Sequence, residues 1–212
     1  GHMPSLTHAF ALLLMLLAHG LACAATEPES QASARLAIQV SHVRISSSTL
    51  LGDGKRLAVL GVSALSGKSL LIHETANGQT LAMAVLPDLC SGATRVLAEA
   101  DGLHVVVVGG DGSICRFDAE GRLKGVVAHP LDGVMSAAVS GDASRLALGT
   151  NDGRIAVLEW PSGKVVWSAT VMPESYFLDL AFTPDTAHLI ACCGDRRKEA
   201  GLMLVSAVTG AV

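Results

Sequence analysis

Short apolar runs separated by polar turns recur along the chain after residue 35. The stretch SRLALGTNDGRIAVLEWPSGKVVW, residues 144–167, shows the pattern most clearly, because two turns, NDG and PSG, separate three apolar runs. Such runs, bounded by Gly, Asp, Asn, Ser or Pro, are typical of β-strands joined by tight turns. No helical period of 3.6 residues is sustained after the N-terminal leader. The pattern therefore predicts an all-β chain.

The pattern also repeats about every 43 residues. Four glycines close equivalent turns, Gly78, Gly121, Gly163 and Gly210, at steps of 43, 42 and 47 residues. Three strands precede each of these glycines, and a fourth follows each of the first three. The predicted strands are Val43–Ser47, Leu57–Leu60, Leu70–Ile72 and Thr80–Val85; Thr94–Ala98, Val105–Val108, Ile114–Phe117 and Leu123–Val127; Met135–Val139, Leu146–Leu148, Ile155–Leu158 and Lys164–Ser168; and Leu178–Phe182, Leu189–Cys192 and Met203–Val205.

Four-stranded units at this spacing are typical of a β-propeller. One twisted sheet cannot cover both of its faces, so neighbouring blades stack on it. We expect a propeller of four-stranded antiparallel blades over residues 35–212, with about four blades present, at 43–87, 94–130, 135–171 and 178–212. Because closure protects the edges of a propeller, such a partial ring is either a piece of a longer protein or is completed by a partner or a second copy.

The stretch Ala128–Glu159 resembles the WD40 repeat, from its Gly-His turn to its Trp-Asp end. The resemblance covers about four units, and it implies a propeller of a family that usually has seven blades. It also places three residues in the structural hydrogen-bond network of that family: Asp111, His129 and Asp152. The chain departs from both signatures. Ala128 replaces the glycine of the Gly-His turn. The positions of the Trp-Asp pair are occupied by His73-Glu74, Phe117-Asp118, Leu158-Glu159 and Val205-Ser206.

The N-terminal residues predict an export segment. Residues 1–3 are typical of a cloning scar, and residues 4–25 hold the apolar run AFALLLMLLA followed by small residues around Cys23. This run is shorter than the roughly 20 residues of a membrane span, so we expect a signal peptide, with a membrane anchor as the alternative. A polar linker follows at residues 26–34. The expected location is therefore extracytoplasmic, either periplasmic or secreted, with membrane anchoring if the leader is retained.

Composition adds few chemical signals. The net charge of −4 and the absence of a Lys/Arg-rich run argue against a nucleic-acid partner. The five cysteines, Cys23, Cys90, Cys115, Cys192 and Cys193, show no zinc-site spacing. An exported compartment would permit disulfides, but we interpret the cysteines of the repeats as small buried apolar side chains.

A catalytic alternative comes from VLEWPSGKVVW, which resembles the tryptophan-docking repeat of quinoproteins, the propeller dehydrogenases that carry pyrroloquinoline quinone. That resemblance implies that Gly163 and Trp167 join adjacent blades, and the pair Cys192-Cys193 is similar to the vicinal disulfide of several quinoprotein alcohol dehydrogenases.

Three observations oppose this alternative. The position of Trp167 is alanine or glycine in the first two units, at Ala82 and Gly125. Adjacent cysteines in a strand point to opposite faces. No acidic cluster has the spacing of a calcium loop. We therefore expect no catalytic residue, no metal and no cofactor, and a structural role for Asp111, Gly163 and Trp167.

The WD40 resemblance places the loops before the first strand and those between the second and third strands at one end of the wheel. Loops on a rigid scaffold commonly carry recognition, and Tyr176, the only tyrosine, is expected beside a basic insertion, which is typical of interface hot spots. The candidate binding residues of this rim are His129, Asp132, Asp152, Glu174, Tyr176, Arg196, Arg197 and Lys198.

The prediction is thus a non-catalytic, exported scaffold for protein–protein interaction. Its expected partner is a protein or peptide, or a second copy that completes the propeller. The alternative is part of a periplasmic quinoprotein-like oxidoreductase.

Overall fold

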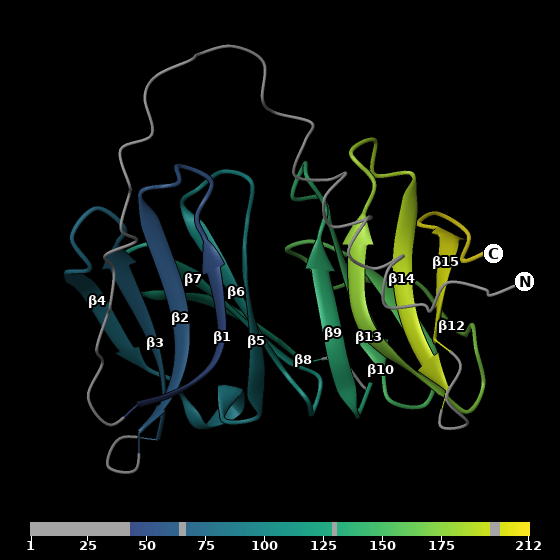
Figure 1. The fold of residues 1–212 in the computed structure, drawn as a ribbon, viewed down its shortest axis with the longest axis horizontal. Helices are drawn as coiled ribbons and strands as arrows, with labels where there is room; N and C mark the ends of the chain where they lie inside the picture. Colours follow the sequence, from purple (N-terminus) through teal and green to yellow (C-terminus); the bar gives the residue numbers. More distant parts are fainter. Residues whose placement is uncertain (1–42, 64–66, 129–130, 196–199) are drawn as a thin grey trace, which may run out of the picture. The chain divides into compact units, whose positions relative to one another are not determined.

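Fifteen strands in four antiparallel sheets make up the part of the chain that the computed structural model describes, residues 43–63, 67–128, 131–195 and 200–212 (Figure 1). These residues belong to one compact unit, Leu36–Val212. We call the sheets blades 1 to 4. Blade 1 contains β1 (Val43–Leu50), β2 (Arg56–Ser63), β3 (Gly67–Glu74) and β4 (Thr80–Val85). Blade 2 contains β5 (Ala93–Ala98), β6 (His104–Gly109), β7 (Ser113–Asp118) and β8 (Leu123–Ala128). Blade 3 contains β9 (Val134–Val139), β10 (Arg145–Thr150), β11 (Arg154–Glu159) and β12 (Val165–Thr170). Blade 4 contains β13 (Ser175–Phe182), β14 (His188–Asp195) and β15 (Ala200–Ser206).

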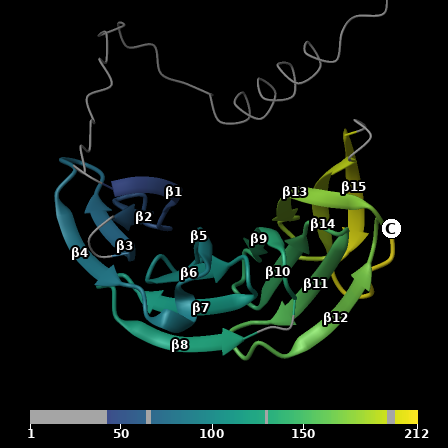
Figure 2. The ribbon, with the colours of Figure 1, turned by 90° about the horizontal axis from the view of Figure 1, so that it is seen from below.

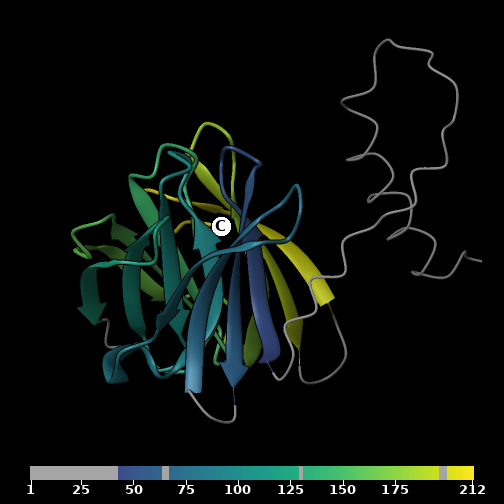
Figure 3. The same cartoon turned by 90° about the vertical axis from the view of Figure 1, so that its left-hand side faces the viewer.

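The strands of each blade pair in chain order, and the blades lie side by side in an open arc (Figure 2). The inner strands β1, β5, β9 and β13 pack on one another in that order. Figure 3 shows the same arrangement from the side of blade 1. None of the described strands of blade 4 packs in this way on blade 1. The predicted fold class is therefore confirmed, as a β-propeller with about four blades and an incomplete ring, and every predicted strand is found within three residues of its expected ends.

The apolar core lies between the blades. Side chains alternate between the two faces of a strand. In blades 2 and 3, which have a neighbour on each side, the side chains of one face therefore pack on the preceding blade and those of the other face pack on the following blade. The residues buried between blades 1 and 2 include Leu60 and Val107, and those between blades 2 and 3 include Val106 and Leu148. Phe177 lies in the cluster between blades 3 and 4. Each sheet is thus stabilised by its neighbours.

A backbone hydrogen bond closes every blade at the same place. The N–H of the residue after the third strand donates to the carbonyl of the residue before the second strand, over 2.8–2.9 Å. The four donor–acceptor pairs are Thr75 to Lys55, Ala119 to Leu103, Trp160 to Ser144, and Ala207 to Ala187. Because both partners are main-chain groups, the bond does not require a particular side chain at the donor position, which is threonine, alanine, tryptophan and alanine in successive blades.

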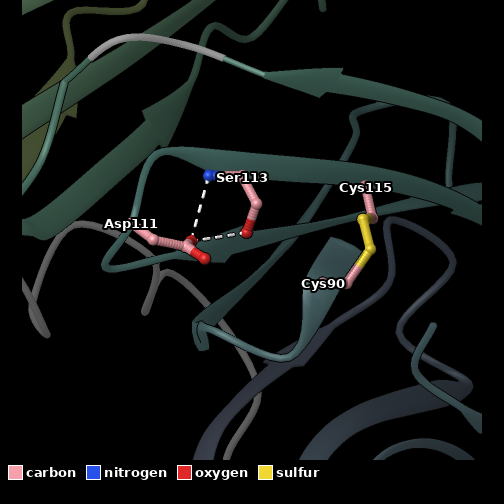
Figure 4. Close-up of a disulfide and its surroundings, with 4 residues drawn as sticks. All are labelled: Cys90, Asp111, Ser113 and Cys115. Atoms are coloured by element: carbon pink, nitrogen blue, oxygen red, sulfur yellow. Dashed lines mark hydrogen bonds between the residues drawn. A yellow bond between two sulfur atoms is a disulfide. The ribbon is translucent and has the colours of Figure 1, made fainter. Parts of the chain in front are cut away.

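One prediction about the cysteines is wrong. Cys90, at the end of the short 3-10 helix η2 (Asp88–Cys90), forms a disulfide with Cys115 of β7, with 6.4 Å between their Cα atoms (Figure 4). Cys90 therefore lies in a 3-10 helix rather than in a strand, and this helix brings its sulfur against the third strand of blade 2. Cys192 and Cys193 are free thiols of β14, and burial raises the pKa of Cys192.

The predicted export segment and linker, residues 1–34, lie outside the described residues. Among residues 43–63, 67–128, 131–195 and 200–212, no helix has the length and apolar character needed to cross a membrane.

Candidate functional site

The described residues of the predicted rim lie at one end of blades 3 and 4. Asp132 precedes β9, and the neighbouring Gly133 carbonyl accepts a hydrogen bond from the N–H of Asn151, which is next to Asp152. Glu174, with a φ of 61°, immediately precedes β13. Tyr176 is half-buried on β13, where its ring lies against Gly194 of β14. The other rim residues, His129, Arg196, Arg197 and Lys198, lie outside the described residues, so their expected proximity to Tyr176 remains a prediction.

Two aspartates that the WD40 resemblance singled out, Asp152 of the rim and Asp111, for which a structural role is expected, organise their own turns. Asp152 accepts hydrogen bonds from the hydroxyl of Thr150 and from Nε of Arg154, the latter over 2.9 Å. Asp111 accepts from the backbone N–H and the hydroxyl of Ser113, over 3.1 and 2.7 Å (Figure 4). The hydroxyl bonds of Thr150 and Ser113 lower the pKa values of Asp152 and Asp111, respectively. Both carboxylates therefore stay ionised at neutral pH and shape the β-turns that carry them.

A buried polar cluster, which the sequence did not reveal, joins blades 2 and 3. Glu99, which follows β5 and is 2% exposed, accepts two hydrogen bonds of 2.7 Å from the Arg116 guanidinium. It also accepts one of 2.8 Å from the indole Nε1 of Trp160 in blade 3. The ion pair with Glu99 raises the pKa of Arg116. The cluster is a fixed polar contact between two blades.

The same cluster contains a set of side chains that could be mistaken for a metal site. Ligand atoms of Glu99, Asp101 and His104 lie within 4.8 Å of one another. However, both oxygens of Glu99 already bind the Arg116 cation, and Nδ1 of His104 is hydrogen-bonded to Asp101 over 2.6 Å. A divalent cation at this place would lie beside the positively charged Arg116 guanidinium, which already binds the Glu99 carboxylate. These residues therefore do not fit a metal.

A second junction, between blades 3 and 4, is held by Trp167 of β12. Its indole Nε1 donates to the carbonyl of Ala207 over 3.0 Å, and its ring lies against the turn glycine Gly210. Nη1 of Arg145 donates to the same carbonyl over 3.0 Å. Gly163, the equivalent turn glycine of blade 3, lies against Val127 of blade 2. These contacts are structural links between successive blades.

An open groove of about 350 Å³ follows the inner strands of the arc. Leu97, Val139, Leu180 and Phe182 are the larger apolar side chains of its lining, and Asp179 supplies its one carboxylate. This lining contains no His, Cys or Lys side chain. The lining of the groove therefore does not assemble an acid–base pair.

Blade 4 exposes apolar side chains at positions that are buried in blade 3. Ile190, Leu202 and Leu204 are 43%, 65% and 53% exposed. By strand register, Ile190 corresponds to Ala147 of blade 3, Leu202 to Ile155, and Leu204 to Val157. These three residues of blade 3 are fully buried. In blade 3 this face is covered by blade 4. The corresponding face of blade 4, formed by Ile190, Leu202 and Leu204, is hereafter called the open face.

Comparisons with known proteins show which solved structures share this fold. No protein-family model and no curated protein matches the sequence. Among solved structures, the β-propeller domain of Cps50 (Swd1) from Myceliophteria thermophila is 16% identical, with a TM-score of 0.61 over 76% of this chain and 53% of that chain. Hydrazine synthase of Kuenenia stuttgartiensis is also 16% identical, with a TM-score of 0.66 over 82% of this chain and 50% of that chain. The chain therefore has the fold of a β-propeller domain.

At this level of identity the likeness concerns the propeller fold alone. The chain spans about half the length of the two solved chains it matches. One of these structures is a propeller domain, and the other bears the name of an enzyme, so the propeller fold does not by itself assign an activity.

Proposed function

We propose that this propeller is an exported, non-catalytic scaffold that binds a protein partner through the open face of blade 4. The observation that carries the proposal is the exposure of Ile190, Leu202 and Leu204 at positions where blade 3 is fully buried. Apolar side chains grouped on one face of a sheet favour a partner that removes them from water. The proposal therefore assigns the open face to recognition.

The expected occupant is another β-sheet that packs face to face, as blade 4 packs on blade 3. A second copy of the chain offers exposed apolar side chains on blade 1, where Leu50, Met83 and Val85 are 56%, 64% and 57% exposed, whereas Val59 and Leu71 on the same face are buried. Joining blade 4 of one copy to blade 1 of the next would continue the arc in the same sense. Two copies related by a two-fold axis would then close the ring without a free sheet face.

Two features support the proposed export. The apolar run of the leader has the length of a signal-peptide h-region and is followed by small residues around Cys23, although no Lys or Arg precedes it. The Cys90–Cys115 disulfide is typical of proteins from oxidising compartments, because cytosolic thiols are kept reduced.

Substituting the open face tests the proposal. In L202K/L204K two exposed side chains become charged, so the isolated fold is retained while packing of a second sheet is opposed by two buried charges. The matched control is L89K/L123K, which adds the same charge at two exposed leucines away from blade 4, Leu89 of η2 and Leu123 of β8. Sedimentation equilibrium is expected to show a concentration-dependent dimer for the wild type and L89K/L123K, and a monomer for L202K/L204K. Circular dichroism verifies that all three are folded.

A monomeric wild type would exclude the second copy as the partner. A photo-crosslinking residue at position 202, compared with one at position 123, then tests for a different protein in the native compartment. Equal crosslinking from the two positions would refute a role for the open face.

A further inference from the structure

The outer strands of the first three blades carry three different residues at one equivalent position. Ala82 pairs with Ile72, Gly125 with Arg116, and Trp167 with Val157, each at the same place in its β-ladder. The blade that follows places its turn glycine near this position, as Gly210 does against Trp167. The side chain at this position therefore decides how the space between two outer blade edges is filled.

Between blades 3 and 4 the indole of Trp167 fills that space. The ring is half-buried against Gly210, and its N–H is bonded to the carbonyl of Ala207. The protein itself thus shows which kind of group fits at this place, a planar ring between an outer strand and the next turn.

Between blades 2 and 3 the same space is open. A Cβ atom at Gly125 would have no heavy atom within 4 Å, and Val127, two residues on, makes the contact with the turn glycine Gly163. A hollow of about 350 Å³ lies there, at the small end of the range for ligand pockets. Its lining includes Arg116, Gly125, Val127, Trp160, Pro161 and Ser162.

The walls of this hollow are fixed before anything binds. Glu99 holds the Arg116 guanidinium by two hydrogen bonds and the Trp160 indole by a third. Val127 and Pro161 add apolar surface, and Arg116 supplies a cation at one side. Apolar walls with a positioned guanidinium suit an aromatic ring, because a cation is attracted to the ring face and a guanidinium also stacks on it.

The geometry points to a binding site for a planar aromatic ring at Gly125, between blades 2 and 3. The ring takes the place that Trp167 fills one blade further on. It comes either from a free small aromatic molecule or from an aromatic side chain on a loop of a partner protein. The site is separate from the open face of blade 4, so its test does not depend on the proposed function.

The experiment uses 5-fluoroindole as the probe and fluorine NMR as the readout. In G125W the new indole occupies the hollow, and probe binding is expected to weaken by at least tenfold. The matched control is G141W, because Gly141 also has no heavy atom within 4 Å of a Cβ position but lies in the turn before β10, away from the hollow. G141W is expected to bind the probe as the wild type does.

A second measurement on the wild type guards against misfolding of G125W. Intermolecular nuclear Overhauser effects from the bound probe are expected at the methyl groups of Val127. Effects confined to other methyl groups, such as those of Leu202 and Leu204, would overturn the proposal, as would absence of probe binding or equal binding by the wild type and G125W.

The source of the ring is distinguished with a short capped peptide that contains a single tryptophan. Tighter binding of the peptide than of 5-fluoroindole, lost in G125W, assigns the site to a partner's side chain. Binding of the free ring alone assigns it to a small aromatic molecule.

Discussion

Replacing Glu99 by alanine tests whether the buried cluster between blades 2 and 3 stabilises the propeller. The substitution removes a carboxylate that accepts three hydrogen bonds, two from Arg116 and one from Trp160. It leaves a guanidinium and a buried indole N–H without their acceptor. Because Glu99 is 2% exposed, little water can take its place unless the junction opens.

The magnitude follows from the burial of the two charges. Removing one partner of a fully buried ion pair costs about 3–5 kcal/mol. The Arg116 side chain is 24% exposed and can regain part of its hydration, so we expect a loss near the lower limit, about 3 kcal/mol. For a domain of this size that corresponds to a fall in melting temperature of about 6–12 °C.

The free energy of unfolding is measured by urea unfolding. The transition is followed in parallel by circular dichroism and by tryptophan fluorescence, to which Trp160 contributes directly. The matched variants are R116M, which keeps an apolar stem at Arg116, and the double variant E99A/R116M. We expect the double variant to lose less than the sum of the single losses, by about 1–3 kcal/mol. A loss below about 1 kcal/mol in E99A, or strictly additive losses, would refute the reasoning.

Two further predictions concern stability. The double variant C90A/C115A removes a crosslink between residues 25 apart, and its free energy of unfolding in urea is expected to fall by about 3 kcal/mol. A reductant should lower the free energy of unfolding of the wild type by the same amount and leave that of the variant unchanged. A wild type whose stability does not respond to reductant would contradict the disulfide. Hydrogen bonds from the Ser140 hydroxyl, and then from the N–H and hydroxyl of Ser144, lower the pKa of Asp142 to about 2. Since this value lies below that of an unfolded aspartate, about 3.9, the stabilisation is complete above that pH and is lost as the pH falls toward 2. D142N should therefore lose less stability than the wild type between about pH 4 and pH 2, and parallel pH profiles in urea unfolding would rule this out.

The strands could be predicted because turn residues mark both ends of each apolar run. The observed β4, Thr80–Val85, has the predicted bounds, whereas β10 extends beyond Leu146–Leu148 to Arg145 and Thr150. The extra residues pair through main-chain groups, which the pattern of side chains does not report. The repeat also gave the order of the blades, because each unit has one face for each neighbour.

The contacts between blades could not be predicted in the same way, because they join residues that are distant in sequence and carry no fixed spacing. Trp160 and Glu99 are 61 residues apart, and the Cys90–Cys115 disulfide joins a turn to a strand with no recognisable motif. One signal for the cluster was present. At the turn position of Glu99, blades 3 and 4 have Ser140 and Thr183, whose hydroxyls bond the aspartates that follow them. A carboxylate at that position departs from the local pattern and indicates a distant partner.

The hydrogen bond that closes each blade has a consequence for how such chains diverge. Its donor position is threonine, alanine, tryptophan and alanine in successive blades, while the N–H to carbonyl distance hardly changes. Substitutions at this position leave the blade closed, so each junction can acquire its own contacts independently, as Trp160 has with Glu99 and Ala207 with Trp167. A propeller built in this way can lose almost all recognisable repeat sequence while each blade keeps its architecture.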